Sequence, residues 1–288
     1  MTVSILGILF DGLAYGSLLF LIGVGLSITL GLMNFVNLAH GVFAMVGGYL
    51  SVYLSQRVGM PFLVTLPLAF VGAALAGLAA ERLLFRHLYK APHLDQVLFT
   101  VGLVFSSIAA AHYFFGAGQQ FAPMPSFLQG QVRVAGIDLG KYRLLLIATV
   151  ALLTVGLHLM LSRTRFGASV RAAVDNQDVA DGLGINVGLV FSLCFALGTG
   201  LAGLGGALGV EVLGLDPGFP MKYMVYFLLV VVVGGAGTIR GPLIAAMLLG
   251  IFDVAGKYYV PQVGAFVIYV LMIVLLLVFP CGLGGKRA

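Results

Sequence analysis

Long apolar runs separated by short polar connections make up most of this chain. Runs of roughly 18 or more apolar residues can cross the hydrocarbon layer of a bilayer, which is about 30 Å thick. Seven such runs are continuous, at residues 5–30, 36–54, 61–80, 97–115, 144–161, 187–210 and 262–279. An eighth, at residues 223–251, is cut by the sequence GGAGTIRGP, so it forms either two tilted spans or a re-entrant pair of half-helices. The pattern predicts an all-α polytopic membrane protein with about eight to nine transmembrane segments, including broken or re-entrant helices.

The composition excludes a soluble fold. Hydrophobic residues make up 61% of the 288 positions and charged residues 9%, whereas soluble domains carry about 25% charged residues. Membrane β-barrels alternate apolar and polar residues over short segments, and this sequence does not. We therefore expect residues 1–288 to form a single transmembrane domain. The net charge of +5 comes from Lys and Arg in the connections between the apolar runs, which indicates a topology signal rather than nucleic-acid binding.

The basic residues of three connections predict the topology. They lie between the third and fourth runs, after the fifth run and at the C-terminal end: Arg82, Arg86 and Lys90; Arg163, Arg165 and Arg171; Lys286 and Arg287. Cytoplasmic connections are enriched in Lys and Arg, and one zigzag places all three in the cytoplasm with the N-terminus outside. The outer connection at residues 116–143 opposes this assignment, because it carries Arg133, Lys141 and Arg143. We expect an ordered loop or a short surface helix there.

The segment SRTRFGASVRAAVDNQDVADGLGI, within residues 162–186, is a patterned polar stretch between two apolar runs. A single helix would place its last acidic residues near a C-terminus, where the helix dipole disfavours anions. Two short helices remove most of this conflict, with Asp175 or Asn176 capping the second. Asp178 then lies in the first turn of that helix and Gly184 ends it. We therefore predict a helical pair.

A helical pair of this kind has apolar positions that need a partner surface. These positions are Ala172, Ala173, Val174, Val179, Ala180 and Leu183. The partner is either another protein or the layer of lipid headgroups, with the arginines on phosphate. The physics of the sequence leaves both alternatives open.

Polar residues next to the second apolar run form a candidate translocation site. Asn34, Asn37 and His40 are spaced by three residues, which places them on one helical face, and Gly41 follows directly. Polar side chains buried in a bilayer mark pathways or contacts between helices. These residues either line the translocation route and brace a broken helix, or form hydrogen bonds between helices. A metal site is not expected, because no Asp, Glu or Cys lies near His40 in the sequence.

The sequence GGAGT interrupts the late apolar run and predicts a helix break. Irregular backbone at membrane depth persists only where it is buried in protein or lines a cavity. The break is therefore either a hinge or gate beside the pathway, or a plain loop between two spans. Its candidate pathway residues are Gly234, Gly235, Gly237 and Thr238.

Two further features have structural interpretations. The sequence GTGLAGLGGALG, at residues 198–209, places small residues where helix backbones can approach closely, within the chain or at a contact between two subunits. Asp11 lies in the first apolar run. It is either an interfacial residue or it faces the interior of the protein.

Four stretches together resemble one protein family. They are GLMNFVNLAHGVFAMVGGYL at residues 31–50, ERLLFRHLYKAP at 81–92, the polar segment at 162–186 and GGAGTIRGPLIAAMLLGI at 234–251. In this order and spacing, over nearly the full chain, they resemble the permeases of ATP-binding-cassette (ABC) importers, in particular the branched-chain amino-acid (LivH-type) family. Within the polar segment the matching residues are Arg165, Phe166, Gly167, Arg171, Ala172, Asp175, Asn176, Ala180, Gly184 and Ile185.

The resemblance implies that the polar segment is a cytoplasmic coupling loop that docks into a groove of an ATPase. The coupling residues would be Arg165, Gly167, Arg171, Ala172, Asp175, Asn176, Ala180, Gly184 and Ile185. It further implies a heterodimer with a second permease subunit, two cytoplasmic ATPase subunits and an extracytoplasmic solute-binding protein. The location would be the bacterial inner membrane, with lipid around a multi-pass protein and no nucleic-acid partner.

The predicted function is therefore that of a permease subunit for branched-chain amino acids or a similar small amphipathic solute. The same likeness covers permeases for urea, short amides and aromatic acids. We expect no enzyme activity, cofactor or catalytic residue, since the phosphate loop of ATPases is absent from the sequence. A stand-alone channel or secondary transporter is the rival class. It would need ionisable residues at mid-membrane, and the apolar runs hold almost none.

Overall fold

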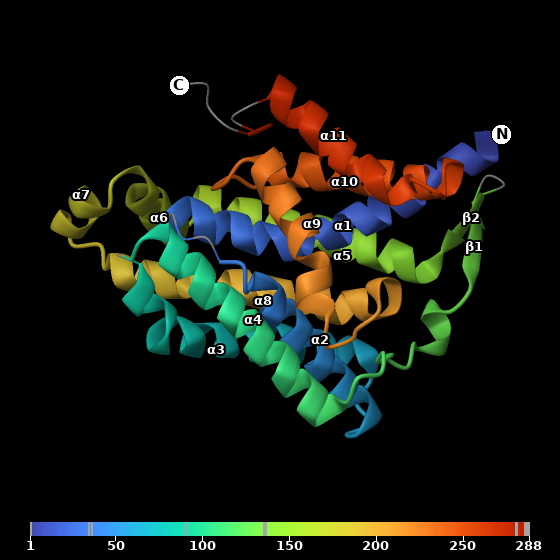
Figure 1. The fold of residues 1–288 in the computed structure, drawn as a ribbon, viewed down its shortest axis with the longest axis horizontal. Coiled ribbons are helices and arrows are strands. Elements are labelled where there is room, and N and C mark those ends of the chain that lie inside the picture. The colour runs from blue at the N-terminus through green and yellow to red at the C-terminus, as the bar shows by residue number, and fades with distance from the viewer. Residues whose placement is uncertain are drawn as a thin grey trace.

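The helices of this chain form one elongated bundle (Figure 1). The structure, a computed structural model, describes residues 2–33, 35, 37–89, 91–134, 137–279 and 282–284. In chain order its elements are α1 (Thr2–Met33), α2 (His40–Gln56), α3 (Phe62–Leu83), η1 (Phe85–Leu88), α4 (His93–Phe115), η2 (Ser126–Leu128), β1 (Gln131–Val134), β2 (Ile137–Gly140), α5 (Lys141–Arg163), α6 (Arg165–Asp175), α7 (Gln177–Gly182), α8 (Val187–Leu213), α9 (Phe219–Gly234), α10 (Arg240–Tyr259) and α11 (Gly264–Val278).

Six helices in the described part of the chain are long and apolar enough to cross a membrane. They are α1, α3, α4, α5, α8 and α10. Two further apolar helices, α9 and α11, are shorter, and α2 has 17 residues. The prediction of a helical, multi-pass membrane protein is confirmed. The interrupted run at residues 223–251 is divided between α9 and α10 at the predicted break.

The central helix of the bundle is α8, which packs on α1, α2 and α3. A Cβ atom on Gly25 of α1 would overlap the backbone of Gly198, and one on Gly47 of α2 would overlap Gly203. Every residue from Gly198 to Val210 is buried. The small residues of α8 therefore bring helix backbones together inside this chain. They do not form the alternative contact between two subunits.

The first half of α1 packs along α10 in the same way. A Cβ atom on Gly16 would lie 2.6 Å from the carbonyl oxygen of Ala246, and Gly250 sits against the backbone of α1 at Gly12 and Gly16. Glycine on both helices lets these backbones meet, which fixes α10 against the N-terminal half of α1.

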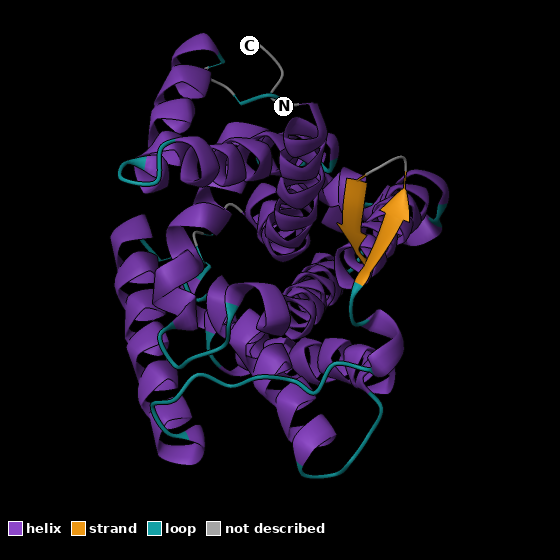
Figure 2. Ribbon diagram, turned by 90° about the vertical axis from the view of Figure 1, so that its right-hand side faces the viewer, coloured by secondary structure: helices purple, strands orange, loops and turns teal. Residues whose placement is uncertain are grey.

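The two ends of the bundle differ. The helices α6 and α7 lie at one end and the β1–β2 hairpin at the other, and Figure 2 looks along the bundle from the hairpin end. At the α6–α7 end, the Ser192 hydroxyl near the start of α8 donates to Glu81 near the end of α3, at 2.7 Å. The Arg-rich connections after α3 and α5 therefore share one end, as the predicted topology requires. Lys90, Lys286 and Arg287 lie outside the described residues.

The outer connection contains a strand pair that the sequence interpretation missed. β1 and β2 are antiparallel, with Arg133 paired in register with Asp138 and 3.7 Å between their charged atoms. The sequence QVRVAGIDLG alternates apolar and polar residues, which is a strand pattern. The expected loop is found at residues 116–130, with the 3₁₀ turn η2 within it, and the strand pair that follows was not expected.

Candidate functional site

The polar segment folds as two helices, α6 and α7, as its charges predicted. The Thr164 side chain caps α6 by accepting a hydrogen bond from the Gly167 N–H, at 3.1 Å. The Asn176 side chain caps α7 by accepting from the Val179 N–H, also at 3.1 Å. Gly184 follows α7 with φ +84°, a conformation that glycine adopts without strain. Of the two predicted caps, Asn176 is therefore the one used.

The inner side of α6–α7 is tied to the bundle. Gly167 packs so closely on Leu161, near the end of α5, that a Cβ atom would overlap the Leu161 backbone. The Arg171 guanidinium donates to the Leu161 carbonyl oxygen. Three small or branched side chains of the pair are buried: Val170, Ala173 and Ala180. Gly167, Arg171 and Ala180, three of the predicted coupling residues, thus hold the pair in place.

The outer side of α6–α7 exposes apolar side chains beside carboxylates. Val174, Val179 and Leu183 are 45%, 57% and 76% exposed. The exposed polar residues of the same segment include Arg165, Asp175, Asn176, Asp178 and Asp181, while Ala172 and Ile185 are half-buried. Of the six apolar positions that needed a partner, two are therefore buried within the chain, one is half-buried and three remain exposed.

One side chain joins α7 to α1. The Gln177 amide nitrogen donates to the carbonyl oxygen of Leu32 at 3.3 Å, one residue before the end of α1. The segment that follows leads into α2 and contains Asn34, which lies outside the described residues. This hydrogen bond links α7 to the last turn of α1.

The structure places Asn37 and His40 together at the start of α2, and both are 1% exposed. The His40 Nε2 lies 3.0 Å from the carbonyl oxygen of Ile22 in α1. Because a carbonyl only accepts, Nε2 carries the proton and Nδ1 is left as an acceptor. Neither His40 Nδ1 nor the side-chain amide of Asn37 has a hydrogen-bond partner among the described residues. Unpaired buried polar atoms are costly, which marks this as a candidate site for function.

These unpaired atoms border a small cavity between α1, α2 and α9. It is closed in this structure and has no space that a water molecule could occupy. Its lining residues are Leu26, Asn37, Leu38, His40, Gly41, Met224, Phe227 and Leu228. Three of the predicted pathway residues, Asn37, His40 and Gly41, therefore share one largely apolar cavity.

The second group of predicted pathway residues packs against α1 a little farther along. The Gly237 N–H donates to the carbonyl oxygen of Ser27 at 2.9 Å, and the Ser27 hydroxyl donates to the carbonyl oxygen of Thr238 at 3.1 Å. Gly235 and Gly237 have φ of +86° and +77°, a region that favours glycine. The backbone of Gly31 lies so close to Gly237 that a Cβ atom would overlap it. The break is thus an ordered turn held against α1, in which Gly235 and Thr238 are half-buried and Ala236 and Gly237 are exposed.

The two groups do not touch in one site, but they flank the same stretch of α1. His40 bonds to Ile22, Leu26 lines the cavity, and Ser27 holds the Gly237 turn. Gly234 adds a further contact, because its carbonyl oxygen accepts from the N–H of Gly284, at 2.9 Å. Residues 22–31 of α1 therefore lie between the broken entry to α2 and the break between α9 and α10.

Two buried carboxylates were missed. Glu81 is 1% exposed and accepts from Ser192 and from the Tyr89 hydroxyl, the latter at 2.9 Å. Burial and the Glu81 carboxylate raise the pKa of Tyr89 above its ordinary value. Glu81 ends an apolar run in the sequence, where an acidic residue is usually interfacial, so the sequence alone held no sign of burial.

Asp253 corrects the expectation that the spans hold almost no ionisable residue. It lies within α10, is 1% exposed and pairs with Lys257 at 2.5 Å, while one of its oxygens has no partner among the described residues. The Lys257 ammonium also lies 5.5 Å from the ring centre of Tyr15. The four-residue spacing of Asp253 and Lys257 was a readable signal for a helical ion pair.

Charged residues at the hairpin end are paired across elements. Asp11 of α1 forms an ion pair with Arg143 at the start of α5, and their side chains are 37% and 42% exposed. Asp11 is therefore at an interface with solvent and also faces another helix. A polar cavity of about 670 Å³ beside this pair is lined by Glu211, among others.

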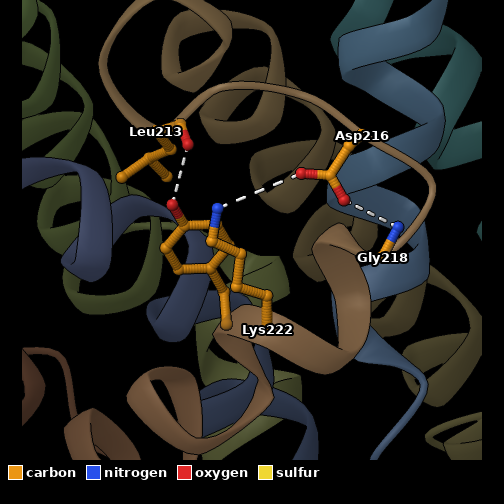
Figure 3. A network of polar contacts seen from close by, with 5 residues as sticks. Leu213, Asp216, Gly218 and Lys222 are labelled. Carbon is orange, nitrogen blue, oxygen red and sulfur yellow. Dashed lines mark hydrogen bonds and ion pairs between the residues drawn. The ribbon is translucent and has the colours of Figure 1, made fainter. Parts of the chain in front are cut away.

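The turn between α8 and α9 is held by a network of its own (Figure 3). The Asp216 carboxylate accepts from the Gly218 N–H at 2.8 Å and lies 4.0 Å from the Lys222 ammonium. The Tyr223 hydroxyl donates to the carbonyl oxygen of Leu213 at 2.8 Å. These contacts fix the start of α9, the helix that closes one side of the small cavity. Among the described residues, no three His, Cys, Asp or Glu side chains gather as metal ligands.

Comparison with known proteins decides the family. A family model described as the permease component of branched-chain amino acid transport systems matches residues 8–276. The chain belongs to this family. It is 27% identical to the high-affinity branched-chain amino acid transport permease BraD of Pseudomonas aeruginosa, over 96% of this chain and 95% of that protein. It is likewise 27% identical to LivH of Escherichia coli, over 96% and 94%, and 28% identical to a probable LivH of Methanocaldococcus jannaschii, over 96% and 92%.

The family assignment drawn from the four sequence stretches, an ABC-importer permease of the branched-chain amino-acid type, is thus confirmed. The chain is a transport permease and not an enzyme. No solved structure matches it significantly.

Proposed function

We propose that this permease is driven by ATP through α6–α7 and imports branched-chain amino acids or a similar small amphipathic solute. The observation that supports this proposal is the way in which the helix pair α6–α7 is held by the bundle. Its inner side is fixed to α5 and α1, and its outer side offers Val174, Val179 and Leu183 at one end of the bundle. A force applied to this pair from outside reaches the stretch of α1 that separates the two helix breaks.

The partner on the outer side is a protein rather than the layer of lipid headgroups. Helices that lie on a membrane carry Lys and Arg on their polar face, because the cytoplasmic leaflet is anionic. Here the arginines Arg165 and Arg171 lie on α6, whereas Val179 and Leu183 in and after α7 are accompanied by Asp178 and Asp181 and by no Lys or Arg. An anionic surface repels these carboxylates, whereas a groove with apolar and basic residues, in an ATPase subunit, accommodates both kinds of side chain.

The assembly that we propose has two ATPase subunits, a second permease subunit in a heterodimer, and an extracytoplasmic solute-binding protein. The α6–α7 end then lies in the cytoplasm and the hairpin end outside, in a bacterial inner membrane. Six long apolar helices plus α2, α9 and α11 give nine membrane segments. In this count, α9 and α10 are two segments that meet at the Gly235–Gly237 turn.

The solute route opens beside Asn37 and His40, at the small cavity that is closed in this structure. The amide and the imidazole of these residues offer hydrogen bonds without a fixed charge, and Leu26, Met224 and Leu228 supply an apolar wall. A solute with a polar head and an aliphatic part satisfies both. Urea and short amides would leave the apolar wall uncovered, so the chemistry of these lining residues favours an aliphatic amino acid once the route opens, in line with the names of the relatives in P. aeruginosa and E. coli.

The decisive test is Leu183→Asp. Leu183 is 76% exposed, so the variant should fold and unfold like the unmodified chain. Loss of an apolar anchor at the centre of a contact, replaced by a charge, should reduce co-purification of the ATPase subunit by roughly tenfold or more. Arg171→Glu is a less clean test, because the guanidinium also holds α6 on α5.

The matched control is Val132→Asp on β1, which is also an exposed apolar residue but lies at the hairpin end. It should leave recovery of the ATPase unchanged. Full recovery of the ATPase with Leu183→Asp would overturn the docking role. Solute uptake by vesicles without ATP would instead identify a channel or a secondary transporter.

A further inference from the structure

An apolar groove separates α2 from α4. It has a volume of about 390 Å³. Its lining residues are Met45, Val46, Tyr49, Leu50, Tyr53, Ser107, Ala110, Ala111, Phe114 and Phe115. The one hydroxyl of α4 among them, on Ser107, donates to the carbonyl oxygen of Val104 within its own helix, at 2.7 Å. The groove therefore offers an occupant almost exclusively hydrocarbon.

At the C-terminal end of α2 the groove continues into a second cavity of about 440 Å³. The two cavities share Tyr53, Phe114 and Phe115. The second cavity also has polar lining residues, Gln56, Arg57 and Gln120. An apolar groove that ends in a polar pocket is complementary to an amphipathic ligand. The polar head of that ligand would lie at the C-terminal end of α2.

The cation of the polar pocket is available to a ligand. Arg57 is exposed at the C-terminal cap of α2, and no ion pair involves it in the part of the chain that the structure describes. The two amides of the pocket are already engaged: Gln56 donates to Phe121 at 2.5 Å, and Gln120 donates to Phe115 at 3.4 Å. The free binding group is thus a single guanidinium, which prefers a phosphate or a carboxylate.

We propose that this composite site binds one anionic phospholipid, with its phosphodiester on Arg57 and an acyl chain in the groove between α2 and α4. The groove follows α2 from Met45 to Tyr53, which corresponds to roughly 12 Å of helix. This is close to the ~15 Å hydrocarbon depth of one leaflet. The head pocket is at the helix terminus, where the headgroup layer lies for a spanning helix.

The lipid would have a structural consequence for α4. The nearest-packed helices of the bundle surround α8, whereas the backbone of α4 lies farther from its neighbours. At the groove α4 meets α2 through the stacked rings of Tyr49 and Phe115, whose centres are 4.2 Å apart. An acyl chain in the groove would fill the space between α4 and α2 and hold α4 in place. This role does not depend on the solute or on ATP.

The test uses the full chain purified in mild detergent, with bound phospholipid counted by native mass spectrometry after addition of phosphatidylglycerol. Arg57→Gln should lower the bound fraction by roughly tenfold, because a charge-assisted hydrogen bond to phosphate is lost. Ala110→Phe should lower it as well, since Ala110 lines the groove. Zwitterionic phosphatidylcholine should bind the unmodified chain more weakly than phosphatidylglycerol.

Matched controls separate the site from the general lipid shell. Ala109→Phe places the same ring on the neighbouring exposed residue, outside the groove lining, and Arg133→Gln removes an exposed arginine on β1. Both should retain the lipid. Equal binding by Arg57→Gln and Arg133→Gln would overturn the proposal. So would protection of the groove by a second protein chain instead of lipid in the assembled transporter.

Discussion

At the scale of single residues, close backbone contacts at glycine determine how these helices pack. A membrane supplies little hydrophobic force between helices, so van der Waals contact and hydrogen bonds must hold them together. A Cβ atom on Gly47 would overlap the backbone of Gly203 in α8, whereas the Cβ position of Gly102 in α4 has no atom within 4 Å. The same residue type therefore has opposite roles at these two positions.

Replacing these two glycines with alanine should have opposite effects. Gly47→Ala forces α2 away from α8 and should lower the free energy of unfolding by about 1–3 kcal/mol. Gly102→Ala removes backbone freedom in an open position and should raise it by roughly 0.5–1 kcal/mol. Denaturant titration of the protein in detergent measures both. Similar effects from the two substitutions would contradict the packing that we describe for α8.

At the scale of elements, α1 connects every part of the proposed mechanism. Its last turn bonds to Gln177 of α7, and Ser27 holds the turn between α9 and α10. Ile22 accepts from His40 at the entry to α2. A helix moves as a rigid body more readily than it bends, so a displacement of α7 would act on both breaks together.

Gln177→Ala should uncouple ATP hydrolysis from transport without releasing the ATPase. The variant loses one hydrogen bond between α7 and α1, worth about 1 kcal/mol, and should lower solute transported per ATP by roughly fivefold. Gln129→Ala is the control, because Gln129 also donates from its amide to a backbone carbonyl, that of Met124, in the outer connection. Unchanged transport per ATP in reconstituted vesicles would exclude Gln177 as the link.

At the scale of the whole molecule, the two ends of the bundle face different compartments in the proposed topology. The α6–α7 end has exposed apolar residues beside carboxylates, and the hairpin end has the Asp11–Arg143 pair and the polar cavity beside it. Only one orientation lets an ATPase reach α6–α7. The docking of the ATPase and the position of the solute-binding protein therefore both depend on this orientation.

Cysteine labelling tests this orientation. With Cys281 replaced by serine, Leu183→Cys should react with a membrane-impermeant thiol reagent only in inverted vesicles, and Val132→Cys only in intact cells. The native Cys194 is buried and should not react with the reagent. Labelling of Leu183→Cys in intact cells would reverse the topology and remove the basis for coupling to a cytoplasmic ATPase.

Local patterns were sufficient for much of this architecture. The apolar runs predicted the helices, because each must satisfy its own backbone in a bilayer. The position of Asn176 and the acidic residues after it predicted the division into α6 and α7, and GGAGT predicted the turn after α9. These features depend on residues within a few positions of one another, so the sequence alone was enough to determine them.

Tertiary structure decided the rest, because it depends on which distant residues meet. The burial of Glu81 requires Ser192, the link from Gln177 requires Leu32, and the groove requires α2 and α4 to lie side by side. The small residues of α8 could have faced a second subunit, and only the fold turns them inward. A periodic pattern in the sequence indicates that one face of a helix must be covered. Which residues cover that face is determined only by the packing of the whole chain.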